Sequence, residues 1–367
     1  MVDIYAVIGA NYGDEGKGLV TNHLCKNAFN NNKKVLNVLT NGGCQRGHTA
    51  YIENKIRHVY SHFGSGYPYA DIYFSKFYKV NPMVFFDEYN ILKDKLYEMN
   101  KIYIDNMCTI TTPYDMLVNR LIENRRTNKH GSCGYGIWET VVRNTIRPIY
   151  WKNLIGLNLF EIIHSIRILR DTYFINRLKE YNIKLTVEES ELFYSETLLH
   201  AYCNDIINMQ SLTIPIDFET IKPLYDTIIF ENAQGLLLDY DINPWGTPSK
   251  TGMTYIRQIV KNELVIPYYV TRSYLTKHGN GDFPGECNKN DINPNINDIT
   301  NHPNNYQGTL RYGKFNETLA KDLLTRIKND CNSDNYKIVV THTNEFSSEF
   351  LNFAHYYSDN EFTFNPI

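Results

Sequence analysis

The 367-residue sequence has no run of about 20 apolar residues and no basic leader before its first apolar segment. We therefore expect neither a membrane span nor a targeting segment. Its 37 lysines and arginines form no long run and the net charge is -3, so no basic surface of the kind that grips nucleic acid is expected. The seven cysteines are scattered, odd in number and without a CxxC pair, which argues against a disulfide framework and a zinc site. These absences predict a cytoplasmic protein with reduced thiols.

What the chain does contain is enough apolar sequence for a sizeable core. Hydrophobic residues make up 43% and charged residues 21%, close to the globular averages of about 45–50% and 25%. Short apolar runs alternate with helical patterns, which predicts an α/β fold with a mainly parallel central sheet flanked by helices. The expected strands are 4–8, 35–39, 71–74, 227–230, 264–270 and 337–340, and the expected helices are 83–97, 159–181 and 315–327.

The organisation of the chain indicates a single elaborated α/β domain over residues 1–367. No internal repeat is visible, and the Asn-rich segment Asn288–Asn305 has the composition of an exposed loop rather than of a linker between domains, because Asn and Asp favour turns. The helical patterns at about 154–209 predict an insertion or lobe within this domain.

A glycine-rich turn, Gly13-Asp14-Glu15-Gly16-Lys17-Gly18, follows the first expected strand. Its small residues let backbone N–H groups approach a phosphate, and the helix that follows presents its N-terminus. The spacing is too short for a Walker A motif, and no Ser or Thr follows the lysine. A glycine-rich turn alone is equally compatible with a structural turn, but carboxylates inside it favour chemistry, because they repel phosphate unless a metal intervenes or one acts as a base.

A second glycine-rich cluster, Asn41-Gly42-Gly43-Cys44-Gln45-Arg46-Gly47-His48-Thr49, follows the second expected strand. Loops at the carboxyl ends of parallel strands converge on one site, so we expect this cluster to face the first turn. An isolated histidine is more often a hydrogen-bonded structural residue. The flexible polar loop around His48 favours a functional role for it.

Four ordered blocks, NYGDEGKGLV, NGGCQRGHT, FENAQGLLLDYD and GNGDFPGE, are together similar to the sequence blocks of adenylosuccinate synthetases. The resemblance runs from the N-terminus to about Asn344, is weaker in the middle and at the end, and covers a chain shorter than the usual family members. It implies a ligase with a P-loop-NTPase-like fold, dependence on Mg²⁺ and a homodimer as the working unit.

The resemblance implies roles for matching residues. Asp14 is the expected general base for the purine ring, His48 stabilises charge on the transferring phosphoryl group, and Gln234 hydrogen-bonds the purine edge. Asp14 and the backbone carbonyl of Gly47 are the expected Mg²⁺ ligands. The expected nucleoside triphosphate-binding residues are Gly13, Glu15, Gly16, Lys17, Gly18, Thr49 and Asn344.

Two further sets are implied for the other substrates. The expected purine monophosphate ligands are Gln45, Ser132, Cys133, Arg143, Gln234 and Thr247, and the expected aspartate ligands are Thr309 and Arg311. The family takes the arginine at the place of Arg143 from the neighbouring subunit, which is the reason for expecting a homodimer; a solvated helix end is the equally weighted alternative for Arg143. Arg272, Lys277 and His278 lie near a matching block and are further candidates for the aspartate pocket, although exposed loop charge is at least as probable a reading for Lys277.

The implied reaction joins IMP to L-aspartate with ATP or GTP as phosphoryl donor. A close alternative is the viral branch that uses dGMP to make the 2-amino product; the retained Asp14 favours IMP, while the short chain keeps dGMP open. A nucleotide-binding regulator without turnover is the alternative from another class. The Asn- and Tyr-rich composition is typical of an AT-rich genome, such as a viral one, in which case the host cytoplasm is the expected location.

Overall fold

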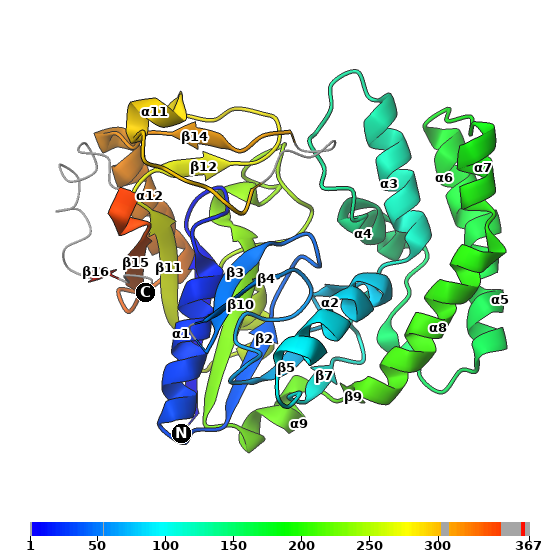
Figure 1. Ribbon diagram of the computed structural model, residues 1–367, viewed down its shortest axis with the longest axis horizontal. Helices are drawn as coiled ribbons and strands as arrows, with labels where there is room; N and C mark the ends of the chain where they lie inside the picture. Colours follow the sequence, from blue (N-terminus) through cyan, green and yellow to red (C-terminus); the bar gives the residue numbers. More distant parts are fainter. Residues whose placement is uncertain (1, 54, 302–307, 346–360, 364–367) are drawn as a thin grey trace.

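The computed structural model describes residues 2–53, 55–301, 308–345 and 361–363. Within these residues the main sheet has nine strands in the order β16-β15-β11-β1-β10-β2-β5-β7-β9 (Figure 1). All of its neighbouring pairs are parallel, which confirms the predicted fold class. The strands are β1 (Asp3–Gly9), β2 (Val35–Leu39), β5 (Asp71–Phe74), β7 (Ile102–Ile104), β9 (Ile214–Pro215), β10 (Thr227–Gly235), β11 (Ile266–Arg272), β15 (Lys337–Thr341) and β16 (Glu361–Thr363).

All six expected strands lie in this sheet; β2 and β5 have the expected ends, and the other four differ at one or both ends. Strand β10 runs to Gly235 rather than stopping at residue 230, because it stays paired with β1 as far as Gly9. Strand β11 begins at Ile266, two residues later than expected, and continues to Arg272. Strands β7, β9 and β16 were not expected, because each has only two or three residues.

Helices cover both faces of the sheet because successive side chains of each strand point to opposite sides. In β1, Ala6 packs in a core with α10 (Thr254–Val260) and α12 (Glu317–Cys331). Its neighbour Val7 packs on the other face with residues of α1 (Lys17–Asn30). The buried, two-sided sheet is what the continuous apolar strands predicted.

A separate cluster of buried residues joins strands β5 and β7 to helices from the middle of the chain. Figure 1 shows α5, α6, α7 and α8 together on one side of the molecule, away from α12 and β16. The expected helix 159–181 consists of α5, a five-residue π-helix (Arg170–Phe174) and α6. The helices that contribute buried residues to this cluster are α2 (Pro82–Lys95), α3 (Pro113–Arg125), α5 (Leu159–Leu169), α6 (Ile175–Glu180), α7 (Val187–Phe193) and α8 (Glu196–Leu212). Helix α4 (Ile137–Ile146) lies between α3 and α5 in the sequence.

The single domain with a lobe at 154–209 stays a prediction, although α5 to α8 occupy most of that stretch. No helix in the described part of the chain combines the length and apolar character that crossing a membrane requires.

Short strands and loops cover the carboxyl edge of the main sheet. An antiparallel pair, β3 (His48–Ile52) and β4 (Ile56–Tyr60), follows β2. A second small sheet joins β12 (Leu275–Lys277), β13 (Glu286–Cys287) and β14 (Arg311–Gly313) after β11. The remaining short elements are β6 (Lys79–Val80), β8 (Thr109–Ile110), α9 (Phe218–Ile221) and α11 (Lys289–Ile292).

Candidate active site

A cavity of about 930 Å³ lies where the main strands end. Its lining comes from the loops after β1, β2, β10, β11 and β15, together with the α3–α4 connection and residues 297–301. Ligands of parallel α/β sheets bind outside the carboxyl ends of the strands. The predicted site residues that line this central cavity are Gly13, Asp14, Gly16, Lys17, Gly18, Gln45, Gly47, His48, Thr49, Ser132, Cys133, Gln234 and Thr247.

The glycine-rich turn is closed from inside by Glu15. Its carboxylate accepts hydrogen bonds from the backbone N–H groups of Asn11 at 3.0 Å and Gly13 at 2.8 Å. Lys17 Nζ lies 2.7 Å from the same carboxylate, and both side chains are buried. Glu15 is absent from the described lining of the cavity, and its role as a triphosphate ligand stays a prediction. Its carboxylate holds the backbone of the turn and the Lys17 side chain from inside.

The turn needs glycine where the chain bends and where α1 approaches the next loop. Gly13 and Gly16 have φ angles of 98° and 92°, a region that L residues rarely adopt. A Cβ on Gly18 would lie 2.8 Å from the backbone oxygen of Thr49. The first turn of α1 is therefore pressed against the second loop, and its free N–H groups face the same space as His48.

Asp14 is fixed by three side chains from the β11–β12 segment. His278 Nε2 lies 2.9 Å from Asp14 Oδ2, Arg272 Nε donates to the Asp14 carbonyl, and Thr276 donates to the Gly13 carbonyl at 3.2 Å. Burial acts to raise the pKa of Asp14, but His278 and then Arg272 and Lys17 outweigh it and hold the pKa well below its usual range. Asp14 is therefore ionised in the cavity. Its backbone has a φ of 57°.

His278 is the matching partner. Burial acts to lower its pKa, but the hydrogen bonds to Asp14 and Asn301 outweigh burial and raise it. The two groups form an ion pair in which each side chain stabilises the charged form of the other.

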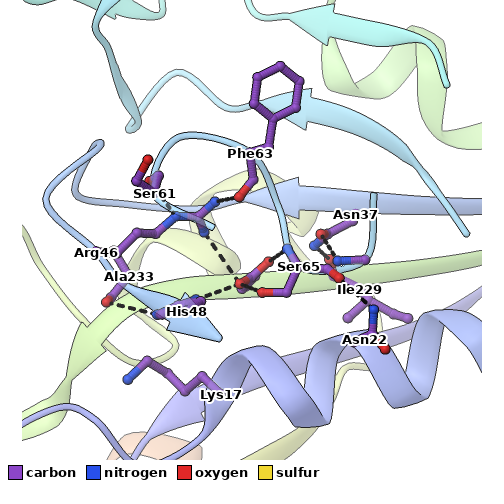
Figure 2. A network of polar contacts seen from close by, with 12 residues as sticks. Lys17, Asn22, Asn37, Arg46, His48, Ser61, Phe63, Ser65, Ile229 and Ala233 are labelled. Atoms are coloured by element: carbon purple, nitrogen blue, oxygen red, sulfur yellow. Dashed lines mark hydrogen bonds and ion pairs between the residues drawn. The ribbon is translucent and has the colours of Figure 1, made fainter. Parts of the chain in front are cut away.

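His48 is oriented by a carboxylate that the sequence prediction did not include (Figure 2). Its Nδ1 lies 2.5 Å from Glu231 Oε1, and its Nε2 lies 3.2 Å from the Ala233 carbonyl oxygen. Glu231 also accepts hydrogen bonds from the backbone and hydroxyl of Ser65, and Arg46 NH1 lies 3.4 Å away. Because a carboxylate only accepts, Glu231 holds a ring proton on Nδ1. Nε2 faces a second acceptor, the Ala233 carbonyl, and can donate only when the ring carries a proton on both nitrogens.

The charges of this group are set by burial and by the neighbours. Burial lowers the pKa of His48, and the bond to Glu231 offsets this only in part. Burial acts to raise the pKa of Glu231, but Arg46, His48 and Ser65 lower it to about 2. Glu231 is the first residue of the ENAQG run within the third sequence block, so its place was visible in the sequence, and only its contact with His48 was not.

Five of the predicted purine monophosphate ligands line the cavity, and three of these, Gln45, Gln234 and Thr247, are joined by hydrogen bonds. Gln45 Nε2 lies 3.4 Å from Gln234 Oε1, and Gln234 donates to Thr247 Oγ1 and to the Ser249 carbonyl at 3.1 Å. Ser132 donates to Asn119 at 2.9 Å.

Arg143 departs from its prediction. It is fully buried, with Nε 3.0 Å from Asp115 Oδ1 and NH2 2.6 Å from the Ile110 carbonyl oxygen. The Asp115 charge compensates the guanidinium inside the core and ties α4 to α3. Arg143 is therefore engaged within its own chain and is absent from the described lining of the cavity, and the homodimer stays a prediction.

The predicted aspartate ligands also lie elsewhere. Arg311 pairs with Glu286 at 2.5 Å and donates to the carbonyls of Gly279 and Gly281 at 3.0 and 2.9 Å. Thr309 is exposed, and neither it nor Arg311 contributes to the described lining of the cavity. The side chain of Asn344 lies outside the described residues.

The residues around Asp14 suit Mg²⁺ only as a partial set. Among the described residues no three His, Cys, Asp or Glu side chains gather into a metal site. Mg²⁺ is ordinarily held by one or two carboxylates together with substrate phosphates and water. The Asp14 carboxylate and the Gly47 carbonyl, from two residues of the cavity lining, are compatible with this coordination.

Four of the aromatic side chains in the lining that the sequence patterns did not single out lie together. They are His130, Trp138, Tyr240 and Trp245, from the α3–α4 connection, the first turn of α4 and the loop after β10, about 100 residues apart in sequence. No spacing or motif relates them, so only the fold brings them together.

A family model described as adenylosuccinate synthetase matches residues 6–314. Curated proteins named adenylosuccinate synthetase from Trichodesmium erythraeum (strain IMS101) and Gloeothece citriformis (strain PCC 7424) are 26% and 30% identical over 299 and 308 residues. The alignments cover 77% of this chain in both cases, and 63% and 62% of the relatives. The chain thus spans less than two thirds of the length of these relatives.

Two solved structures share the fold. The fully ligated adenylosuccinate synthetase from Plasmodium falciparum superposes with a TM-score of 0.72 at 20% identity and covers 92% of this chain and 76% of its own. The cyanophage S-2L succinoaminodeoxyadenylate synthetase (PurZ), bound to dGMP and to dATP as an energy donor, has a TM-score of 0.65 at 13% identity. It covers 98% of this chain and 91% of its own.

Proposed function

The chain belongs to the adenylosuccinate synthetase family, and on this premise we propose that it is a ligase that couples a purine nucleoside monophosphate to L-aspartate at the expense of a nucleoside triphosphate. The observation that carries the proposal is the meeting of Asp14, Lys17 and His48 in the lining of one cavity. An ionised carboxylate, a lysine beside a helix N-terminus and an oriented histidine are the groups that phosphoryl transfer to a ring oxygen requires.

In the first step the triphosphate lies against the glycine-rich turn. Lys17 and the N–H groups at the start of α1 bind its phosphates, and Asp14 accepts the N1 proton of the purine. The 6-oxygen then attacks the γ-phosphorus, and the bond to the β-phosphate oxygen breaks, which releases the diphosphate. His48, when it carries a proton on Nε2 as well as on Nδ1, donates to the charge that develops on the transferring group. Mg²⁺, held by Asp14 and the Gly47 carbonyl, would neutralise phosphate charge when bound.

In the second step the aspartate amine attacks C6 and phosphate leaves with the 6-oxygen. The amine loses a proton as the new C–N bond forms. No covalent enzyme intermediate is required, because the 6-phosphoryl group has already turned the ring oxygen into a good leaving group. We propose IMP as the monophosphate, with Asp14 as the residue that favours it.

The second candidate is dGMP. The cyanophage protein bound to dGMP and dATP matches this chain over nearly the full length of both, whereas the curated adenylosuccinate synthetases extend well beyond the aligned part. Guanine also carries an N1 proton, so Asp14 acting as a base does not exclude dGMP; Asp14 favours IMP only through the resemblance, in which the dGMP branch often replaces this aspartate.

The test is release of inorganic phosphate by the purified full chain with Mg²⁺ and triphosphate. IMP, dGMP or no monophosphate is supplied, each with and without L-aspartate. We expect release that depends on one monophosphate and on aspartate. Phosphate release that requires dGMP and aspartate, and that does not occur with IMP, would select the second candidate. Binding of nucleotides without any phosphate release would replace the proposal by a regulator that has lost turnover.

A further inference from the structure

Three large rings and an imidazole, from Trp138, Tyr240, Trp245 and His130, form what we call the aromatic wall of the cavity. Trp138 and Trp245 are only partly buried, and Tyr240 is 47% exposed. The third tryptophan, Trp151, is 1% exposed in the core. Burying a large aromatic side chain is strongly favourable, so two tryptophans that remain open to one cavity point to a ligand that covers them.

The rings of the aromatic wall hold one another in place. The ring centroids of His130 and Trp245 are 5.5 Å apart, and those of Trp138 and Tyr240 are 5.2 Å apart at an angle of 69°. His130 and Trp138 are joined at 6.4 Å. Contacts of this length lie within the range of favourable aromatic pairs, so the wall is a connected surface rather than a set of loose side chains.

Glycines fix this surface to the loop that carries His278. A Cβ on Gly281 would lie 2.4 Å from the Trp245 ring, and one on Gly131 would lie 2.6 Å from the Cα of Gly279. Both glycines have positive φ. The close packing allowed by missing side chains sets the position of Trp245 and of the His130 loop.

Polar groups border the aromatic wall. Ser132 follows His130 by two residues, and Thr247 follows Trp245 by two residues; both line the cavity, as does Gln234, which donates to Thr247. A flat apolar face beside amide and hydroxyl groups suits a heteroaromatic ring, whose faces stack and whose edges hydrogen-bond. L-aspartate has no such face, and the triphosphate is drawn to Lys17 and the start of α1.

We propose that the aromatic wall is the stacking surface for the purine ring of the nucleoside monophosphate. The inference deepens the proposed function and rests on it. Trp245 and Trp138 supply the faces against which the base lies, and Tyr240 and His130 hold these two indoles at their angle.

The chain's three tryptophans make the test direct. A Trp138→Phe, Trp245→Phe double variant leaves only the buried Trp151 to emit, while Trp151→Phe leaves only the two wall tryptophans. IMP and dGMP are titrated against each protein with tryptophan fluorescence as the readout, and ribose 5-phosphate serves as the probe without a base. We expect either purine nucleotide that binds to quench the wild type and Trp151→Phe, and to leave the double variant unquenched. Ribose 5-phosphate is expected to quench none of them.

Affinity gives a second, independent readout by calorimetry. Trp245→Leu is expected to raise the Kd of the monophosphate about tenfold, in the range that base-aromatic stacking supports, and Trp245→Phe to restore most of the affinity. Quenching that persists in the double variant, quenching by ribose 5-phosphate, or an unchanged Kd in Trp245→Leu would overturn the inference. A protein that shows the expected quenching but releases no phosphate would contradict the proposed function alone, and one that binds neither nucleotide would overturn both.

Discussion

The two walls of the cavity are built in different ways. On the glycine-rich side, ionisable groups hold one another: Glu15 with Lys17, Asp14 with His278, and Glu231 with His48. On the aromatic wall, rings contact rings. Held charges are suited to stabilising charge that develops during a reaction, because they need little rearrangement when it appears. Flat rings stabilise a bound base equally before and during the reaction, which affects binding more than rate.

This difference makes a general expectation for substitutions. Changes among the held charges are expected to lower kcat, whereas changes on the aromatic wall are expected to raise KM and leave kcat almost unchanged.

The largest effect is expected for Asp14→Asn. The amide keeps the shape of the side chain and tolerates the positive φ of this position, but it cannot take a proton from the purine. Loss of a general base typically lowers turnover about 10²–10⁴-fold. Steady-state phosphate release measures the loss, and circular dichroism checks that the variant is folded. Turnover close to that of the wild type would remove Asp14 from the reaction.

His48→Ala tests whether the oriented histidine acts in the transition state. Removing a donor aimed at developing charge typically lowers kcat about 10²–10³-fold. We expect the KM for the triphosphate to change much less. If kcat were preserved and only this KM rose, His48 would be a binding residue, and the distinction between the two walls would not hold for it.

Glu231→Gln separates the orientation of His48 from the stability of the core. The variant leaves Arg46 and the His48 environment without a buried negative charge, and breaking such a pair destabilises a protein by about 3–5 kcal/mol. Asp115→Asn is the matched control. Asp115 and Arg143 also form an ion pair in which both side chains are fully buried, and neither residue belongs to the described lining of the cavity.

Both variants should therefore lower the midpoint of urea unfolding, and only Glu231→Gln should lower kcat, by about tenfold or more through misorientation of the imidazole. Equal kcat values in the two variants would show that Glu231 acts on stability alone.

The main strands and the two glycine-rich loops could be predicted from the sequence because each is a local pattern. Buried strands have continuous apolar runs, and the loops that follow them carry their polar residues within a few positions of the strand end. The parallel sheet then brings Asp14 and His48 into one cavity without further information.

The parts that could not be predicted depend on partners distant in sequence. In the sequence, Arg143 is compatible with a ligand at a helix end. In the fold, Asp115, which lies 28 residues earlier, forms a buried ion pair with it. Arg311 is likewise taken by Glu286. The aromatic wall joins residues 130 and 245 through glycine contacts, and no periodicity connects them. Such pairings follow from tertiary packing, which a single sequence does not display.

The smallest expected effect is on the choice between adenine and guanine as the base of the phosphoryl donor. The short helix Thr343–Glu345 follows β15 and places Glu345 in the cavity lining, where its carboxylate accepts a hydrogen bond from Tyr274 at 2.6 Å. The neighbouring His342 also lines the cavity, and burial, helped by Arg272, lowers its pKa to about 3. This histidine is therefore neutral, and it stands where the resemblance implies a lysine.

Asn344 stands where the resemblance implies an aspartate that accepts hydrogen bonds from guanine. A neutral amide both donates and accepts, which matches the edge of adenine and removes the charge-assisted pair with guanine. An unmatched buried group of this kind raises the free energy by about 1–3 kcal/mol, so we expect kcat/KM with ATP or dATP to exceed that with GTP by at least about fivefold. Asn344→Asp should shift the ratio towards GTP, and Glu345→Gln, whose carboxylate is already bound to Tyr274, should leave it unchanged as the control. Initial rates with each triphosphate at equal concentrations measure the ratio. A wild-type preference for GTP, or a shift produced by Glu345→Gln instead, would show that the base is read by a group other than Asn344.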